Sequence, residues 1–400
     1  MDKQQQSRER SSIGEVFFAF LSLGLRSFGG PIAHLGYFRD EFVGRRHWLD
    51  DNAYADLVAL CQFLPGPASS QVGIALGYAR AGYGGALAAF IGFTAPSALI
   101  MLAVAAGAAL SESPLGSALI HGLKLAAVAV VAQAVLAMGR SLAPDAPRRS
   151  LALFTACILL MFPQAWVQVA VILAGAAFGL RFVADVAIPA EIKALPHPPR
   201  PHGVVFLVIF CVLLVGAPFV AEKGSDFLRV LAVFYQSGSL VFGGGHVVLP
   251  MLEAGLVPWA IADDLFLAGY GAAQALPGPL FAFAAFIGSA MNVAPNGVVG
   301  GLSALIAIFL PAILLVLGAL PFWAELRKTP QARRAMAGVN AAVVGVLAAA
   351  LYDPVFTAGV TQRSDMAIVI ACLWLLEVAK RPSWWAVVLA AAAAVLVRFV

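Results

Sequence analysis

Long apolar runs, separated by short polar stretches or by glycine and proline, make up most of this chain. An α-helix needs about 17 to 25 mostly apolar residues to cross a bilayer. Several runs have that length, and others are shorter or are interrupted by proline. The pattern predicts apolar helical segments over residues 13–28, 53–79, 84–110, 115–138, 151–161, 165–182, 204–220, 227–242, 265–289, 297–320, 335–351, 366–377 and 384–399.

The composition strengthens this interpretation. Hydrophobic residues make up 61% of the chain and charged residues only 12%, whereas about 25% of a soluble domain is charged. The apolar runs are too long, and alternate too little, for an outer-membrane barrel. We attribute the net charge of +4 to loop residues that orient the protein in the membrane, and not to a surface that binds nucleic acid. We expect an all-α polytopic membrane protein with about 12–13 transmembrane segments, broken helices included.

A Pro-Gly-Pro break interrupts one apolar segment in each half of the chain. Gln62 with Pro65-Gly66-Pro67 returns as Gln274 with Pro277-Gly278-Pro279. Other anchors recur in the same order, at offsets between 212 and 216 residues: Phe28-Gly29-Gly30 with Phe242-Gly243-Gly244, Asp50-Asp51 with Asp263-Asp264, Pro96 with Pro311, and Gly122 with Gly338. The sequence therefore predicts two homologous repeats, 1–185 and 223–400, joined by a linker with an extra transmembrane segment at 186–222.

The basic loops suggest that the repeats are inverted. In the first half Arg140, Arg148 and Arg149 follow segment 115–138, whereas in the second half Arg333 and Arg334 precede segment 335–351. Basic loops stay in the cytoplasm, so equivalent segments should cross in opposite directions, and the extra segment makes the inversion possible. With six crossings in each repeat, this topology puts the C-terminus outside. It also puts the amphipathic, arginine-rich stretch 34–49 at the outer membrane surface.

The breaks are the best candidates for a binding site. Proline and glycine should end one half-helix and start another, and inside a bilayer such a break is tolerated where it is packed in protein or lines a wet cavity. After the first break, Ser69, Ser70 and Gln71 could join free backbone N–H groups in holding an oxyanion. The matching residues 280–283 carry no polar side chain, so we expect an asymmetric site. Close helix packing alone is the alternative explanation of both breaks.

Other polar residues extend this candidate site. The glycine corners could form anion-binding nests or simple turns, and the histidines beyond them could contact the anion, carry protons or lie solvated at the interface. Intramembrane cations could neutralise an anion or reach toward the headgroups. Glu253, Asp263 and Asp264 could carry protons or be loop acids. The candidate substrate-binding residues are Arg26, Gly29, Gly30, His34, Gln62, Pro65, Gly66, Pro67, Ser69, Ser70, Gln71, Lys124, Gly243, Gly244, Gly245, His246, Gln274, Pro277, Gly278, Pro279 and Asn340.

Signatures of enzymes and of ATP-driven pumps are missing from the sequence. It contains no zinc-binding His-Glu-x-x-His, no Gly-x-Ser-x-Gly elbow and no phosphate-binding loop. We therefore expect a transporter without catalytic residues, metal or cofactor.

Three runs of the sequence, 23–34, 54–67 and 241–250, closely resemble the chromate ion transporter family of the ChrA type. They contain Arg26-Ser27-Phe28-Gly29-Gly30-Pro31, Gln62-Phe63-Leu64-Pro65-Gly66-Pro67 and Phe242-Gly243-Gly244-Gly245-His246. The likeness covers nearly the whole chain and includes the duplication of the long, two-domain members. It implies a multi-pass protein of the bacterial inner membrane that exports chromate, confers chromate resistance and is driven by the proton motive force.

The resemblance leaves alternatives open. Some relatives handle sulfate, so a sulfate or other oxyanion importer or exchanger shares these features, and a membrane-embedded enzyme or scaffold is an alternative of another class. The expected partners are chromate or sulfate, coupled protons and the lipid bilayer, and a homodimer is compatible with the sequence. No nucleic-acid partner is expected.

Overall fold

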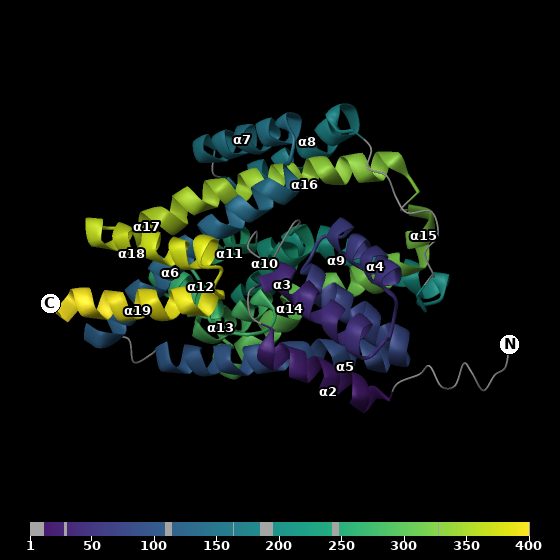
Figure 1. Ribbon diagram of the computed structural model, residues 1–400, viewed down its shortest axis with the longest axis horizontal. Coiled ribbons are helices and arrows are strands. Elements are labelled where there is room, and N and C mark those ends of the chain that lie inside the picture. Colours follow the sequence, from purple (N-terminus) through teal and green to yellow (C-terminus); the bar gives the residue numbers. More distant parts are fainter. Residues whose placement is uncertain are drawn as a thin grey trace.

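The computed structural model describes residues 12–27, 30–108, 114–162, 164–184, 195–241, 248–326 and 328–399. Within these ranges the chain forms helices and loops and no strand (Figure 1). The first repeat contains α2 (Ile13–Arg26), α3 (Gly30–Arg39), the π-helix η1 (Asp40–Arg45), α4 (Asp51–Phe63), α5 (Ala68–Ala108), α6 (Pro114–Leu142), α7 (Ala146–Met161) and α8 (Ala165–Phe182).

The extra helix α9 (Arg200–Lys223) connects the repeats. The second repeat contains α10 (Asp226–Leu240), α11 (Val248–Leu256), α12 (Asp263–Ala273), η3 (Leu280–Ala282), α13 (Phe283–Ala290), α14 (Gly297–Ala319), η4 (Leu320–Phe322), α15 (Trp323–Leu326), α16 (Pro330–Ala350), η5 (Leu351–Phe356), α17 (Thr357–Gly359), α18 (Arg363–Leu373), η6 (Trp374–Val378) and α19 (Ser383–Phe399).

Five helical stretches in the described part of the chain are long and apolar enough to cross a membrane: Ala68–Gly107, Leu115–Arg140, Arg200–Glu222, Gly297–Leu326 and Pro330–Gly359. Shorter apolar helices accompany them, such as Val167–Phe182 and Ser383–Arg398. These lengths confirm the predicted all-α polytopic membrane class.

Equivalent helices of the two repeats run antiparallel, as the charge pattern predicts. Along α5 and α14, the Phe90 ring packs on the Phe309 ring, whereas Leu102 lies against Gly301. Rising numbers in one helix therefore meet falling numbers in the other. The same holds for α6 and α16, because Gly139 faces Val344 while Val128 faces Gly359 in α17.

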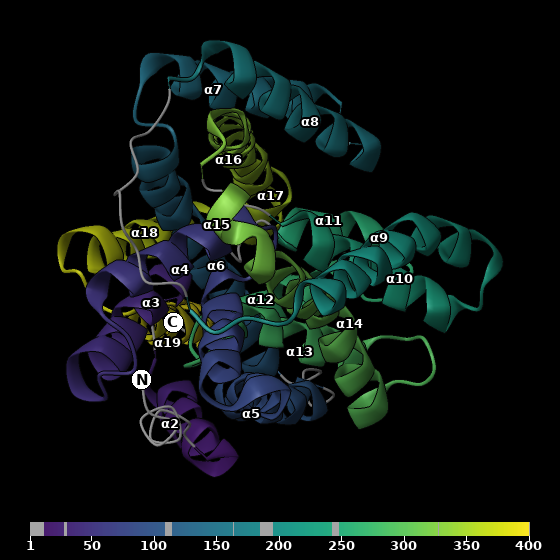
Figure 2. The ribbon, with the colours of Figure 1, turned by 90° about the vertical axis from the view of Figure 1, so that its right-hand side faces the viewer.

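Each repeat completes the other at its periphery. The pair α7 and α8 packs on α16 of the second repeat, and Gly175 and Gly338 approach so closely that neither has room for a Cβ atom. The pair α18 and α19 packs in the same way on α6, where Gly122 meets Ala390. Figure 2 shows α7 and α8 lying across the top of α16, with α9 and α10 on the right. The repeats are thus interlocked and cannot be separated into independent cores.

Helix α5 is two antiparallel helices joined by a sharp turn. Ala81 and Gly82 have non-helical backbone angles, and the chain folds back so tightly that Gly77 and Gly85 have no room for a Cβ atom between them. Gly288 of α13 and Gly300 of α14 form the same contact in the second repeat. The two ends of each segment with a break also lie together, because the Arg80 guanidinium packs on the Trp48 ring just before α4, and the Asn292 N–H donates to the Ala260 carbonyl oxygen just before α12. Each of these segments therefore turns back at its break. This arrangement refines the prediction of six full crossings in each repeat.

The first helix is also too short to cross. Helix α2 has 14 residues, a length of about 21 Å against a hydrocarbon core of about 30 Å. After it, α3 and η1 return toward its start, where Arg46 lies 3.6 Å from Glu15 of the first helical turn. The topology expected from the sequence had put this arginine-rich stretch on the opposite side from the start of the chain. The contact corrects that placement and agrees with the positive-inside rule.

The apolar face of the same stretch packs on protein. Phe38 and Phe42 are fully buried and contact Phe20 of α2, whereas the sequence suggests a helix lying at the membrane surface. Trp48 stacks on Phe42. The aromatic side chains of this stretch therefore anchor it to α2, and its arginines lie at the exposed edge, or rim, of the first repeat.

Candidate functional site

The two breaks meet the opposite repeats. The Gly66 N–H donates a hydrogen bond to the Val241 carbonyl oxygen at the end of α10, at 2.6 Å. The Gly278 N–H donates to the Ser27 carbonyl oxygen at the end of α2, at 2.9 Å. Each break thus holds the end of the other repeat's first helix, and the two contacts are equivalent under the duplication. The proline breaks therefore lie in the interface between the inverted repeats.

Glycine is required in both breaks. Gly66 has φ +118° and Gly278 has φ +96°, in the left-handed region that other residues rarely adopt. A Cβ atom at Gly66 would lie 2.9 Å from the Gln71 amide nitrogen, and one at Gly278 would lie 2.9 Å from the Ser97 hydroxyl. Backbone conformation and close packing both exclude a larger residue at these positions.

Three polar residues directly follow the first break. Ser69, Ser70 and Gln71 are all buried in the first turn of α5. The Gln71 amide donates to the Pro65 carbonyl oxygen at 2.7 Å, which closes the break on itself. The Ser69 hydroxyl lies 3.4 Å from Nδ1 of His34, a buried residue of α3. The structure therefore brings His34 to the residues that the sequence had assigned to the same site.

Several buried polar atoms around this break have no hydrogen-bond partner among the described residues. They are Ser27 Oγ, His34 Nε2, Ser70 Oγ, Gln71 Oε1 and Thr94 Oγ1. Phe93 links the group, because its ring packs on His34 while its backbone lies beside Gly278. Leaving such a group unsatisfied costs about 1 to 3 kcal/mol. The atoms therefore form a polar lining suited to a ligand or to water.

Sequence reasoning did not select Ser27 and Thr94 as site residues. Ser27 precedes the first glycine corner, and Thr94 lies two residues before Pro96. Hydroxyl groups next to a helix break were a usable signal. The complete burial of these hydroxyl groups could not be predicted from the sequence, because it depends on contacts with the other repeat.

The second break is apolar, as the sequence predicts. Leu280, Phe281, Ala282 and Phe283 are buried, and the ring of Phe281 packs on Phe309. The backbone carbonyl oxygen of Gln274 accepts a hydrogen bond from the Ser383 hydroxyl at 2.6 Å, while the side-chain Nε2 of Gln274 has no partner in the described part of the chain. The backbone of the break is conserved between the repeats, and its polar side chains belong almost entirely to the first.

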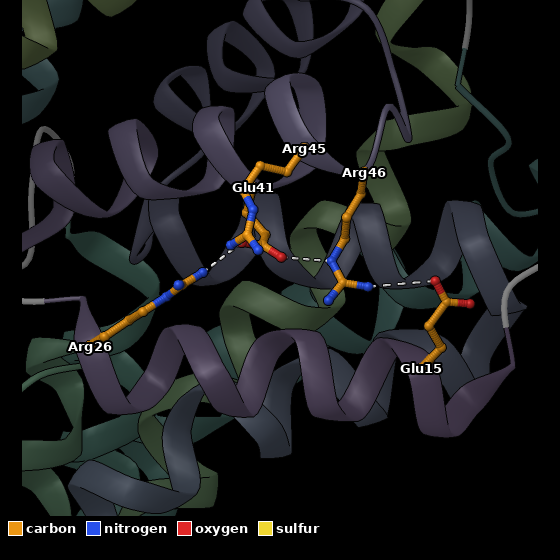
Figure 3. A network of polar contacts seen from close by, with 5 residues as sticks. All are labelled: Glu15, Arg26, Glu41, Arg45 and Arg46. Atoms are coloured by element: carbon orange, nitrogen blue, oxygen red, sulfur yellow. Dashed lines mark hydrogen bonds and ion pairs between the residues drawn. The ribbon is translucent and has the colours of Figure 1, made fainter.

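Arg26 is already paired with an acid. Its guanidinium donates to the Glu41 carboxylate at 2.5 Å, and Arg45 and Arg46 donate to the same carboxylate at 2.9 and 2.7 Å (Figure 3). Burial alone would raise the pKa of Glu41. The hydrogen bonds from Arg46 and Arg26 and the charge of Arg45 outweigh burial and lower that pKa, so the carboxylate is ionised at neutral pH.

Lys124 lies in a different environment from the first break. Its ammonium pairs with Asp264 at the start of α12, and both line a cleft of about 930 Å³ that also contains His121 and Asp365. His121 Nε2 lies 2.9 Å from the Asp365 carboxylate. The lining of this cleft does not include Ser69, Ser70 or Gln71. The structure thus does not bring Lys124 together with the proposed hydroxyl ligands.

The remaining candidates fall into two groups. Gly29, Gly243, Gly244, Gly245 and His246 lie outside the described residues. The others are placed as follows: Gly30 starts α3 with φ +77°, Gln62 is exposed at the end of α4, Pro67, Pro277 and Pro279 are buried, Pro65 is half-buried, and Asn340 is half-buried in α16 with no partner for its side-chain oxygen among the described residues.

Comparison with known proteins identifies the family. The model of the chromate transporter family matches residues 14–180 and again residues 228–396. The chain belongs to the chromate transporter family. The two matched regions coincide with the two halves that carry the breaks, so each half corresponds to one copy of the family's unit.

Curated relatives of this family member resemble it over most of its length. A chromate transport protein of Pseudomonas aeruginosa is 28% identical over 355 residues, covering 86% of this chain and 81% of the relative. A chromate transport protein of Cupriavidus metallidurans is 26% identical over 374 residues, covering 92% and 87%. A probable chromate transport protein of Synechococcus elongatus is 27% identical over 356 residues. No solved structure matches the chain.

Proposed function

We propose that this chain is a secondary transporter that exports chromate across the bacterial inner membrane and thereby confers chromate resistance, with the proton motive force as its energy source. The observation that carries the proposal is the reciprocal contact of the two breaks. Gly66 binds the end of α10 and Gly278 binds the end of α2, beside a group of buried polar atoms that have no partner among the described residues. Family membership and the names of the relatives support chromate as the substrate.

The chemistry of the lining suits a tetrahedral oxyanion. Chromate offers only acceptor oxygens, so it requires hydrogen-bond donors around it. Hydroxyl groups of Ser69 and Ser70 and the free backbone N–H groups at the start of α5 are such donors, and the positive end of the helix dipole points the same way. Gln71 holds the break in shape through the Pro65 carbonyl oxygen. In this proposal the first repeat supplies most ligands and the second supplies shape.

The membrane potential favours export. Moving a dianion across about 100 mV changes its free energy by roughly 2 × 2.3 kcal/mol, and the outward direction is downhill when the interior is negative. An importer of the same anion would need coupled cations to overcome this term. Antiparallel repeats that meet at the site provide the symmetry by which it could face one side and then the other.

Everted membrane vesicles from cells that express the chain test this function. Export in the cell becomes uptake into such vesicles, so energised vesicles should accumulate labelled chromate. Vesicles from cells without the chain are the control, and unlabelled sulfate and molybdate measure selectivity. Lack of accumulation under every driving force would exclude export. Accumulation of sulfate without chromate would reassign the substrate.

A further inference from the structure

One buried carboxylate at the rim of the first repeat is surrounded by three guanidinium groups. The Glu41 side chain is 5% exposed, whereas those of Arg26, Arg45 and Arg46 are 44%, 68% and 32% exposed. Glu15 adds a second acid at 3.6 Å from Arg46. Three cations therefore share two acids, and the network keeps a positive charge. Figure 3 shows the guanidinium groups converging on Glu41 from α2 and from η1.

The arginines have donor capacity that Glu41 does not use. A guanidinium has five N–H donors arranged in a fork that matches carboxylate and tetrahedral oxyanions. Arg26 and Arg45 each make one hydrogen bond to Glu41 in the described part of the chain. A dianion presents more acceptor oxygens and twice the charge of a carboxylate. It is therefore a stronger partner for the same three cations.

The network lies next to the proposed transport site. Arg26 ends α2, and the following residue, Ser27, is the buried serine whose carbonyl oxygen accepts from Gly278. Arg46 lies at the opposite end of α2, beside Glu15. That end carries the start of the chain, which the positive-inside rule assigns to the cytoplasm. The arginines thus extend from the cytoplasmic rim toward Ser27, one of the buried polar residues of the proposed transport site.

Glu41 is held by an irregular element. It belongs to η1 (Asp40–Arg45), a π-helical turn that directly follows α3. Single π-turns within helices occur frequently at functional sites. A return of this turn to α-helical geometry would rotate Glu41 about the helix axis and withdraw it from the arginines.

We propose that Glu41 is an internal placeholder in an oxyanion capture site formed by Arg26, Arg45 and Arg46, and that a tetrahedral dianion from the cytoplasm displaces it before reaching the first break. This inference rests on the proposed function, because it names the entry site of the same transport path. It has a consequence that a purely structural ion network lacks. Removing the carboxylate and removing an arginine should change anion affinity in opposite directions.

Equilibrium binding of sodium molybdate and sodium sulfate to the purified full-length chain in detergent tests the proposal. Titrations are made in a Ser69→Ala/Ser70→Ala background, which weakens the break and isolates the rim. Glu41→Gln should tighten anion binding about tenfold, because the competing carboxylate is gone. Arg45→Gln should weaken it about fivefold, a modest effect because this arginine is exposed.

Arg39→Gln is the matched control. Arg39 precedes the same π-turn, carries the same charge and is 57% exposed, but it pairs with Asp51 and not with Glu41. It should leave anion affinity unchanged. Equal weakening by Arg39→Gln and Arg45→Gln would reduce the effect to general surface charge and overturn the proposal. Weaker binding in Glu41→Gln would also overturn it, since that is the result of a structural network.

Two further outcomes separate this site from its alternatives. If Glu41→Gln does not fold, the contrast between Arg45→Gln and Arg39→Gln still decides. Binding of phosphatidylglycerol vesicles without binding of the free anions would assign the arginines to lipid headgroups and overturn the proposal. Chromate accumulation by the wild-type chain in vesicles tests the proposed function independently, so failure of the capture site and failure of export are distinguishable.

Discussion

The breaks of the two repeats have the same backbone conformation, but polar side chains follow the first break and apolar side chains follow the second. Both place a glycine in the left-handed region, and in both its N–H donates to the residue that directly follows the other repeat's first helix. After the first break come Ser69, Ser70 and Gln71, and after the second come buried leucine, phenylalanine and alanine. The shared part is what the interlocked fold needs. The part that differs is free to be specialised for a ligand.

The surroundings follow the same division. Most of the buried polar atoms that lack a partner among the described residues gather at the first break, whereas aromatic rings pack around the second. In the proposed function, the first repeat supplies most anion ligands and the second supplies shape. The predictions below test whether the two breaks are equivalent in backbone structure and different in what their side chains contribute to transport.

The largest effect is expected at the glycines, whose backbone conformation is the same in both breaks. Gly66→Ala and Gly278→Ala should each lower the free energy of unfolding by about 1 to 3 kcal/mol, because alanine is strained at positive φ, and both should abolish efflux. Thermal unfolding in detergent and chromate accumulation in vesicles measure the two effects. Gly107→Ala, a helical glycine with no atom near its Cβ position, is the control. Tolerance at one break alone would show that the two are not structurally equivalent.

A smaller effect is expected where the breaks differ. Ser69→Ala with Ser70→Ala should raise the KM for chromate about tenfold, equivalent to the loss of about 1.4 kcal/mol of binding, while expression stays normal. Initial rates of chromate uptake into everted vesicles provide the measurement. Ser303→Ala on α14, a half-buried serine of the second repeat, should not change KM. Unchanged kinetics in the double variant would remove both hydroxyls from the site.

The smallest effect concerns α6 and α16, where Lys124 of the first repeat matches Asn340 of the second. Lys124 is 10% exposed and its partner Asp264 is 74% exposed. Asp264→Asn leaves a buried ammonium without its counter-charge, and should lower the free energy of unfolding by about 1 kcal/mol. Lys124→Met should lower it less, since the freed carboxylate is hydrated. Chemical unfolding of the two purified variants compares their free energies of unfolding. A larger loss in Lys124→Met than in Asp264→Asn would show that the Asp264 carboxylate depends on Lys124, and not the reverse.

Much of this architecture could be predicted from residue patterns. The Pro-Gly-Pro breaks, the spacing of the repeated anchors and the positions of basic loops are local features, and they indicated two inverted copies. The apolar character of residues 280–283 indicated the asymmetry of the site. These predictions hold because proline, glycine and charge impose their constraints within a few residues of where they stand.

Other features were predicted wrongly or not at all. The stretch 39–46 was expected outside, because segment 13–28 was counted as one of six crossings in the first repeat, but Arg46 returns to Glu15. The acidic partners of Arg26 and Lys124, which are Glu41 and Asp264, were not predicted, because each partner belongs to a different element of the fold. Ser27 and Thr94 were missed, since their burial comes from packing between elements.

By itself, then, the sequence determined the class of protein, the duplication, the place of each break and the side chains offered there, because these depend on composition and on short-range stereochemistry. Only the tertiary structure decided that segments turn back before crossing, that each break holds the opposite repeat, and which charges are already paired. Those outcomes depend on contacts between residues far apart in the chain, where the free energy of burying a helix face or a charge is set by its neighbour.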